Sequence, residues 1–295
     1  MTHQDIIIPE EVFDWYDSYA HGGIDRREFM TRLGKYAVGG LTVAALAGAI
    51  LPNYALAEQV SFNDPEIKAT YETFLSPDGH GEGRGYYVSP RKADGPQPAV
   101  LVVHENRGLN PYVKDVARRL AKAGFIAFAP DALHPLGGYP GNDDEGRKMQ
   151  RSMDRSKIEA DFKAAAKFLK TREDTTEKTG VVGFCFGGFI SNMLAAEVPD
   201  LIDASVPYYG SPARLETIKN IKAPMMHQLG SLDKRINQMW PSYEAALKAG
   251  GVDFRMHMYA DAHHGFHNDS TRRFKKDAAD LSWERTLAFF KEHLA

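Results

Sequence analysis

The chain has a single cysteine, Cys185, which stands between Gly183-Phe184 and Phe186-Gly187. Glycines on both sides of such a residue permit a sharp strand-to-helix turn, whose apex residue is strained and points out of the sheet. The amides and the positive dipole end of the following helix favour a thiolate and a developing oxyanion. The pattern therefore favours a nucleophilic cysteine over a small buried apolar residue, provided that partners follow.

A cysteine nucleophile needs a base and a group that holds that base. Asp233 follows the apolar stretch 224–229, and Asp261 follows the stretch 253–259, so both are expected in loops after strands. The second loop also carries three histidines: His263, His264 and His267. The order of nucleophile, acid and histidine is that of the α/β-hydrolases. These residues alone leave both aspartates open as the acid and all three histidines open as the base.

Alternating apolar strands and helices from residue 58 onward position these groups. Continuous apolar runs predict buried strands, and periodic ones predict helices. The expected strands are 71–75, 85–89, 98–104, 125–129, 204–209, 224–229 and 253–259, and the expected helices are 112–123, 157–170, 243–248 and 280–293. Strands that alternate with helices imply a parallel sheet with right-handed crossovers. We therefore expect one α/β domain over residues 58–295, with residues 131–144 as a loop that lines the site.

These motifs resemble the dienelactone hydrolase family, also called carboxymethylenebutenolidases, over residues 65–293. The resemblance rests on Gly-Phe-Cys-Phe-Gly-Gly, Gly-Ser-Leu-Asp, Ala-His-His-Gly-Phe and the stretch 104–110. It implies an α/β-hydrolase fold, a mostly parallel sheet with helices on both faces, and hydrolysis of a small ester or lactone. It also implies that Cys185 is the nucleophile, Asp233 the acid and His264 the base, with no metal or organic cofactor.

The resemblance assigns two further features beside the thiol. It implies that Glu105 gates the thiol and takes its proton when substrate displaces the carboxylate; the alternative is a loop carboxylate paired with Arg107. The backbone amides of Asn106 and Phe186 are where this fold places an oxyanion hole.

The substrate pocket departs from the family pattern. Family members resemble one another in two arginines that bind a carboxylate, but the stretch 132–139 directly after Pro130-Asp131 has no arginine, and Asn268 stands near the second position. Arg272 or Arg273 could reach the pocket from later in the chain. The residues that bind substrate are therefore not predicted.

Residues 1–57 differ in composition from the rest of the chain. Arg26-Arg27, the apolar run 36–51 and Ala55-Leu56-Ala57 resemble a twin-arginine export signal, with cleavage after Ala57 and a periplasmic or secreted product. The run is too short for a permanent membrane span. The alternative is a retained, cytoplasmic arm, because Val12, Tyr16 and Tyr19 form an aromatic helix face that would pack on its own chain or on a second subunit in a homo-oligomer.

Composition excludes several functions. With 43 % hydrophobic and 25 % charged residues and a net charge of −3, the chain is an ordinary globular protein with no basic stripe for nucleic acid. A single cysteine excludes an intrachain disulfide and a multi-thiolate zinc site. Alternative functions are a general carboxylesterase or peptidase and a non-catalytic binding or oligomerising protein. A redox sensor is a further alternative, but an oxidised Cys185 would have no second thiol in the chain with which to form a disulfide.

Overall fold

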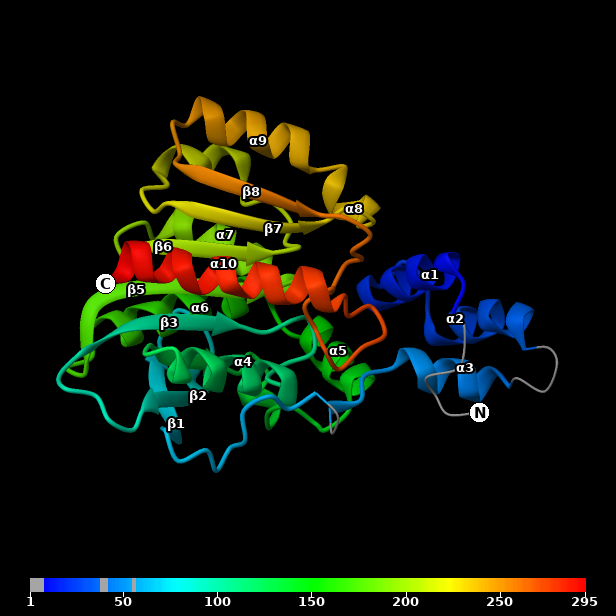
Figure 1. Ribbon diagram of the computed structural model, residues 1–295, viewed down its shortest axis with the longest axis horizontal. Coiled ribbons are helices and arrows are strands. Elements are labelled where there is room, and N and C mark those ends of the chain that lie inside the picture. Colours follow the sequence, from blue (N-terminus) through cyan, green and yellow to red (C-terminus); the bar gives the residue numbers. More distant parts are fainter. Residues whose placement is uncertain (1–7, 38–41, 55–56) are drawn as a thin grey trace.

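Eight strands form one sheet in the computed structural model, which describes residues 8–37, 42–54 and 57–295 (Figure 1). The strands are β1 (Ile67–Ser76), β2 (Gly81–Pro90), β3 (Gln97–Val103), β4 (Ile126–Pro130), β5 (Thr175–Phe184), β6 (Ala204–Tyr208), β7 (Met225–Gly230) and β8 (Phe254–Tyr259). Their order is β1-β2-β4-β3-β5-β6-β7-β8. The pairs β1–β2 and β2–β4 are antiparallel, and every other pair is parallel. The predicted fold class, a mostly parallel sheet in an α/β protein, is confirmed.

Helices cover both faces of the sheet. The helices are α1 (Glu10–His21), α2 (Arg26–Leu33), α3 (Val43–Ile50), α4 (Pro111–Lys122), α5 (Asp143–Ser152), α6 (Arg155–Lys170), α7 (Phe186–Glu197), α8 (Lys234–Asn237), α9 (Trp240–Ala249) and α10 (Lys276–Leu294), with short 3₁₀ turns η1 (Gly34–Tyr36), η3 (His134–Leu136) and η4 (Leu215–Asn220). Helices α4 and α10 lie on one face, and α6 and α7 on the other (Figure 1).

The central strands are apolar on both sides because both faces are covered. Residues 99–103 of β3 and Val181 and Val182 of β5 are completely buried, as expected for parallel strands between two helical layers. The next helix, α4, begins where the Asn110 side chain accepts a hydrogen bond from the Val113 amide. This arrangement places the loops after β3, β5, β7 and β8 along one edge of the sheet.

Helices α1–α3 form an N-terminal arm, residues 8–37 and 42–54, beside the carboxyl ends of the parallel strands (Figure 1). As the spacing predicted, Val12, Tyr16 and Tyr19 are buried on one face of α1, where they pack with Phe29 and other residues of the arm. In this structure the aromatic face therefore packs on its own chain.

The features expected of an export signal are only partly within the described residues. Arg26 and Arg27 open α2, and Arg26 Nε lies 3.6 Å from Asp144 Oδ2 of α5. Residues 38–41 of the apolar run, and Ala55 and Leu56 of the expected cleavage site, lie outside the described residues. None of the described helices has the length and apolar character needed to cross a membrane. Cleavage after Ala57 stays a prediction.

Candidate active site

Cys185 occupies the turn between β5 and α7 with φ = +57°, a left-handed conformation that side chains rarely adopt. The flanking glycines make this turn possible. A Cβ on Gly183 would collide with the carbonyl oxygen of Gly187, and a Cβ on Gly187 would collide with that of Val103. The cysteine therefore sits at a strained apex at the start of a helix, where helix amides can stabilise negative charge.

Asp233 and His264 form a buried hydrogen-bonded pair. His264 Nδ1 lies 2.6 Å from Asp233 Oδ2, and Asp233 also caps α8 by accepting from the Ile236 amide. Burial by itself would lower the pKa of His264, but the charges of Asp233, Asp17 and Cys185 raise it to about 10. The pKa of Asp233 is lowered, because the charge of His264 outweighs the burial that would raise it. The pair therefore carries an imidazolium held by a carboxylate near neutral pH.

The other candidates from the same loop have different surroundings. His267 Nδ1 lies 2.7 Å from the Tyr112 hydroxyl, and its ring stacks on Phe184. The ring of His263 packs on the Phe13 ring of α1, with centroids 4.6 Å apart. Asp261 is exposed. Of the residues left open by the sequence, His264 has a ring nitrogen within 4.8 Å of Cys185 Sγ, and Asp233 is the hydrogen-bond partner of that histidine.

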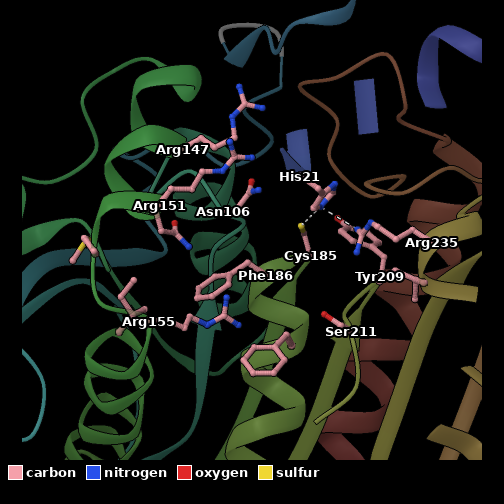
Figure 2. A pocket seen from close by; sticks show the side chains of 15 residues that line it. His21, Asn106, Arg147, Arg151, Arg155, Cys185, Phe186, Tyr209, Ser211 and Arg235 are labelled. Atoms are coloured by element: carbon pink, nitrogen blue, oxygen red, sulfur yellow. Dashed lines mark hydrogen bonds between the residues drawn. The ribbon is translucent and has the colours of Figure 1, made fainter. Parts of the chain in front are cut away.

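A second histidine, His21, reaches the thiol from the N-terminal arm. Its Nε2 lies 3.2 Å from Cys185 Sγ (Figure 2). Its Nδ1 lies 2.8 Å from the carbonyl oxygen of Asp17 and 3.2 Å from Asp17 Oδ1. The sequence analysis did not identify this residue. The only local signal is the spacing of four between Asp17 and His21, which places both on one side of α1.

Cys185 is therefore flanked by two imidazoles. One side-chain donor atom from each of His21, Cys185 and His264 lies within 4.8 Å of the others. Burial alone would raise the pKa of the Cys185 thiol, but the charges of both histidines hold it well below the ordinary 9.0. Two imidazoles and a thiolate are also a ligand set that zinc accepts. The expectation that no metal is required stays a prediction.

Arg235 of α8 connects the two histidines. Its Nη2 lies 3.0 Å from His21 Nε2 (Figure 2). The same Nη2 lies 3.3 Å from His264 Nδ1, and Nε lies 3.3 Å from Asp17 Oδ2. A guanidinium only donates hydrogen bonds and always carries charge, so Arg235 is a third cationic group beside the thiol. Burial would lower the pKa of His21, but the charge of Cys185 and the hydrogen bond to Asp17 raise it.

Glu105 is buried but turned toward other partners. Its Oε2 accepts a hydrogen bond of 3.0 Å from Asn268 Nδ2 and lies 4.0 Å from Arg107 Nη1. Its expected role as a gate for the thiol stays a prediction. Asn106 and Phe186 both line the cavity next to Cys185, and their assignment to an oxyanion hole also stays a prediction.

A cavity of about 350 Å³ opens beside the thiol, with Cys185 and His21 in its lining. Three arginines from α5 and α6 form one wall: Arg147, Arg151 and Arg155 (Figure 2). Among the described residues, Arg151 has no ion-pair partner. Neither Arg272 nor Arg273 lines this cavity; Arg273 lies over the Tyr16 ring of the arm instead. None of these arginines stands at the positions expected from the family, although the spacing of four between Arg147 and Arg151 places them on one side of α5.

Comparisons with known proteins show which proteins the chain resembles. The chain is 64 % identical over 114 residues to the Escherichia coli K12 hydrolase fragment YghX, covering 39 % of this chain and 97 % of that one. It is 37 % identical to protein usf of Aquifex pyrophilus, covering 72 % of this chain and 94 % of that one. An Aquifex aeolicus protein that carries the name carboxymethylenebutenolidase is 34 % identical, with the same coverage of both chains.

Solved structures show the same fold. The dienelactone hydrolase of Anabaena variabilis superposes with a TM-score of 0.62 at 22 % identity, over 78 % of this chain and all of that one. The dienelactone hydrolase-like promiscuous phosphotriesterase P91, from metagenomic libraries, superposes with a TM-score of 0.68 at 22 % identity, also over 78 % and all of the two chains.

Two family profiles match separate parts of the chain. Residues 1–38 match the YqhI-like family, a segment that holds His21. Residues 84–294, from β2 to the last turn of α10, match the Dienelactone hydrolase family. With this match over most of its length, the chain belongs to the dienelactone hydrolase family.

Proposed function

We propose that the protein is a cysteine hydrolase that cleaves a small ester or lactone carrying a negative charge. The observation that carries the proposal is the position of Cys185. Its sulfur sits at a strained turn, has a lowered pKa, and faces a cavity beside the Asp233–His264 pair. The name carboxymethylenebutenolidase on relatives such as the Aquifex aeolicus protein supports a lactone or ester bond as the target.

In the proposed reaction, the Cys185 thiolate bonds to the carbonyl carbon, and the amides of Asn106 and Phe186 stabilise the oxyanion. The carbon–oxygen bond to the leaving alkoxide then breaks, and the alkoxide takes a proton from the His264 imidazolium. The neutral imidazole next takes a proton from water, whose oxygen attacks the acyl carbon. The carbon–sulfur bond breaks and the thiolate returns.

The arginine wall is the reason for proposing a negatively charged substrate. Arg151 and Arg155 line the same cavity as Cys185, and guanidinium groups bind carboxylates by paired hydrogen bonds. A cavity of about 350 Å³ lies near the lower limit for small-molecule sites. It would admit a compact ester or lactone with one carboxylate.

A pair of matched substrates tests the proposal: 4-nitrophenyl acetate and the mono-4-nitrophenyl ester of succinate, which adds a carboxylate. Wild type should prefer the succinate ester, and Cys185→Ala should hydrolyse neither above the buffer rate. Arg151→Gln should raise KM for the succinate ester about tenfold, since one carboxylate contact is lost, and leave KM for the acetate unchanged. Equal rates for wild type and Cys185→Ala would end the cysteine assignment.

A general carboxylesterase is the second candidate, because part of the cavity lining is apolar, with Ile158, Phe186 and Phe189 in it. That function predicts equal kcat/KM for the neutral and the charged ester. A non-catalytic binding protein predicts no turnover of either ester by wild type, and a slow reaction of Cys185 with iodoacetamide.

Localisation and assembly are separate proposals. Export through the twin-arginine motif, with removal of residues 1–57, predicts that this segment carries a reporter out of the cytoplasm. Retention predicts a native chain that keeps the segment, and mass spectrometry of protein from its own cells separates the two. Assembly into a homo-oligomer through α1 predicts a mass above that of one chain in light scattering.

A further inference from the structure

We propose that His21 is a second catalytic histidine, which exchanges a proton with Cys185, so that the N-terminal arm is a working part of the active site. This inference rests on the proposed cysteine chemistry. It also takes the retained form of residues 1–57 over the cleaved form, since a chain cut after Ala57 lacks the histidine.

The first argument is the geometry of the imidazole. His21 Nδ1 donates to the carbonyl oxygen of Asp17 at 2.8 Å, so this nitrogen carries a hydrogen and Nε2 faces the sulfur at 3.2 Å. The Asp17 carboxylate lies 3.2 Å from the same Nδ1. An imidazole with a carboxylate behind it and a nucleophile before it is the arrangement of a general base.

The second argument is that the arm is anchored at the end of α1 that carries His21. Backbone carbonyls in the last turn of a helix have no partner within the helix. Asn106 Nδ2 donates to the Ala20 carbonyl at 2.8 Å, and Arg147 Nη1 donates to the Tyr19 carbonyl at 3.3 Å. Both donors line the cavity of the thiol. The walls of the cavity therefore hold the helix end that presents His21.

A glycine completes this anchoring. Gly22 follows His21 with φ = +83° and ends α1 with amide hydrogen bonds back to Ser18 and Tyr19. A Cβ at Gly22 would collide with the guanidinium of Arg151. The helix thus stops at the cavity wall, and its negative dipole end favours a positive charge on the His21 ring.

Earlier in α1, at Tyr16, buried arginines hold the arm on the domain. Arg107 Nη2 donates to the Tyr16 hydroxyl at 3.3 Å, and the guanidinium of Arg273 lies 4.7 Å from the centre of the Tyr16 ring. Both arginines are almost completely buried. Removal of the arm would expose these cations and the face that they cover, which argues for an arm that stays bound.

The proton step follows from these positions. In a site with a neutral His21, the S–H bond of Cys185 breaks and a bond from hydrogen to His21 Nε2 forms, which gives a thiolate and an imidazolium. Glu105, the other base considered for this step, accepts from Asn268 instead. Each ring has its own carboxylate behind it and the sulfur in front of it, so both rings can carry a proton once the thiol has lost its own. His21 thereby serves the thiol, and His264 serves the leaving alkoxide and the water.

The test compares full-length wild type with His21→Gln, and follows alkylation of Cys185 by iodoacetamide across the pH range together with hydrolysis of the succinate ester. We expect the pH midpoint of alkylation to move up toward that of a free thiol. We also expect kcat/KM to fall about 10- to 100-fold, which is at or below the smallest effect usually found for a general base. His21→Ala should regain activity when imidazole is added to the buffer, which a merely structural loss would not allow.

His263→Gln is the matched control, because His263 also packs on α1, through the Phe13 ring and 3.4 Å from Glu10, but does not line the thiol cavity. It should keep the wild-type alkylation profile. A His21→Gln protein with the wild-type profile, or with a higher kcat/KM because the arm only blocks the thiol, would overturn the inference. So would a native mature chain that begins after residue 57. Activity that survives in Cys185→Ala would instead overturn the proposed function itself.

Discussion

Two aspartate–histidine pairs face one sulfur, and the chain builds them in different ways. Asp233 and His264 are 31 residues apart and meet because β7 and β8 are neighbours in the sheet. Asp17 and His21 are four residues apart, on successive turns of α1. The geometry within the first pair thus depends on the tertiary fold. That within the second is local, and only its distance from the sulfur depends on docking of the arm.

The largest expected effect comes from removing one carboxylate charge at a time. Asp233→Asn should lower kcat by about 10²- to 10⁴-fold, because the amide no longer stabilises the His264 imidazolium. Asp17→Asn should lower kcat only about tenfold, since a helix end still supports the His21 ring. Steady-state hydrolysis of the succinate ester measures both losses.

Asp14→Asn provides the control for this comparison. Asp14 lies one turn before Asp17 on α1, and it pairs at 2.7 Å with the exposed Lys234 on the surface. Surface pairs of this kind contribute little, so kcat should not change. A larger loss in Asp17→Asn than in Asp233→Asn would reverse the assigned rank of the two pairs.

Inhibition by zinc should show whether His21 binds an ion together with Cys185 and His264. The donor atoms of His21, Cys185 and His264 lie close enough to bind one ion, so added Zn²⁺ should inhibit wild type and a chelator should restore activity. His21→Gln removes a ligand contributed by the arm and should weaken inhibition about tenfold or more, the scale of changes around a metal site. Equal inhibition of both proteins would mean that the arm provides no ligand.

The smallest effect concerns the pH dependence of stability. The pKa of His264 is raised from 6.5 to about 10, and that of Cys185 is lowered from 9.0. The pKa of His21 is raised as well. Between about pH 6.5 and 9, the folded chain holds protons on both histidines while the unfolded chain holds one on sulfur, so the free energy of unfolding should fall as the pH rises. Above pH 9 the unfolded thiol has lost its proton too, and the fall should become steeper until about pH 10.

Cys185→Ala sharpens this prediction, because it removes the compensating thiol. Its stability should fall more steeply than that of wild type above about pH 6.5, since the Asp233 carboxylate still favours the charged ring. Urea denaturation at a series of pH values measures both curves. Identical curves for the two proteins would show that the thiol and the imidazole are not coupled.

Local signals made part of this site predictable from sequence. Cys185, Asp233 and His264 each follow an apolar strand within a glycine-containing motif, so strand periodicity places them at one sheet edge. The choice among the three histidines of one loop needed the family resemblance, because spacing alone does not show which ring turns toward the sulfur.

The rest of the site depends on tertiary contacts or on elements without apolar periodicity. Helix α5 is almost entirely polar, so it has no apolar periodicity from which to predict a helix. One helix signal is the cap Asn142, whose side chain accepts from the Asp144 and Glu145 amides. The arginine wall that α5 begins was missed with it. His21 was missed because a histidine at the end of a helix is ordinary until the docking of the arm is known.

The sulfur stands in the middle of the polypeptide, 164 residues from the imidazole that approaches it from the N-terminal side, and the second imidazole lies close to the opposite terminus. A ribosome must therefore make the chain through His264 before Cys185 has both neighbours. Until then the thiol keeps its ordinary acidity and is mostly protonated at neutral pH. Incomplete or misfolded chains thus carry a thiol that reacts slowly with electrophiles. The reactive thiolate forms only when both His21 and His264 have reached Cys185.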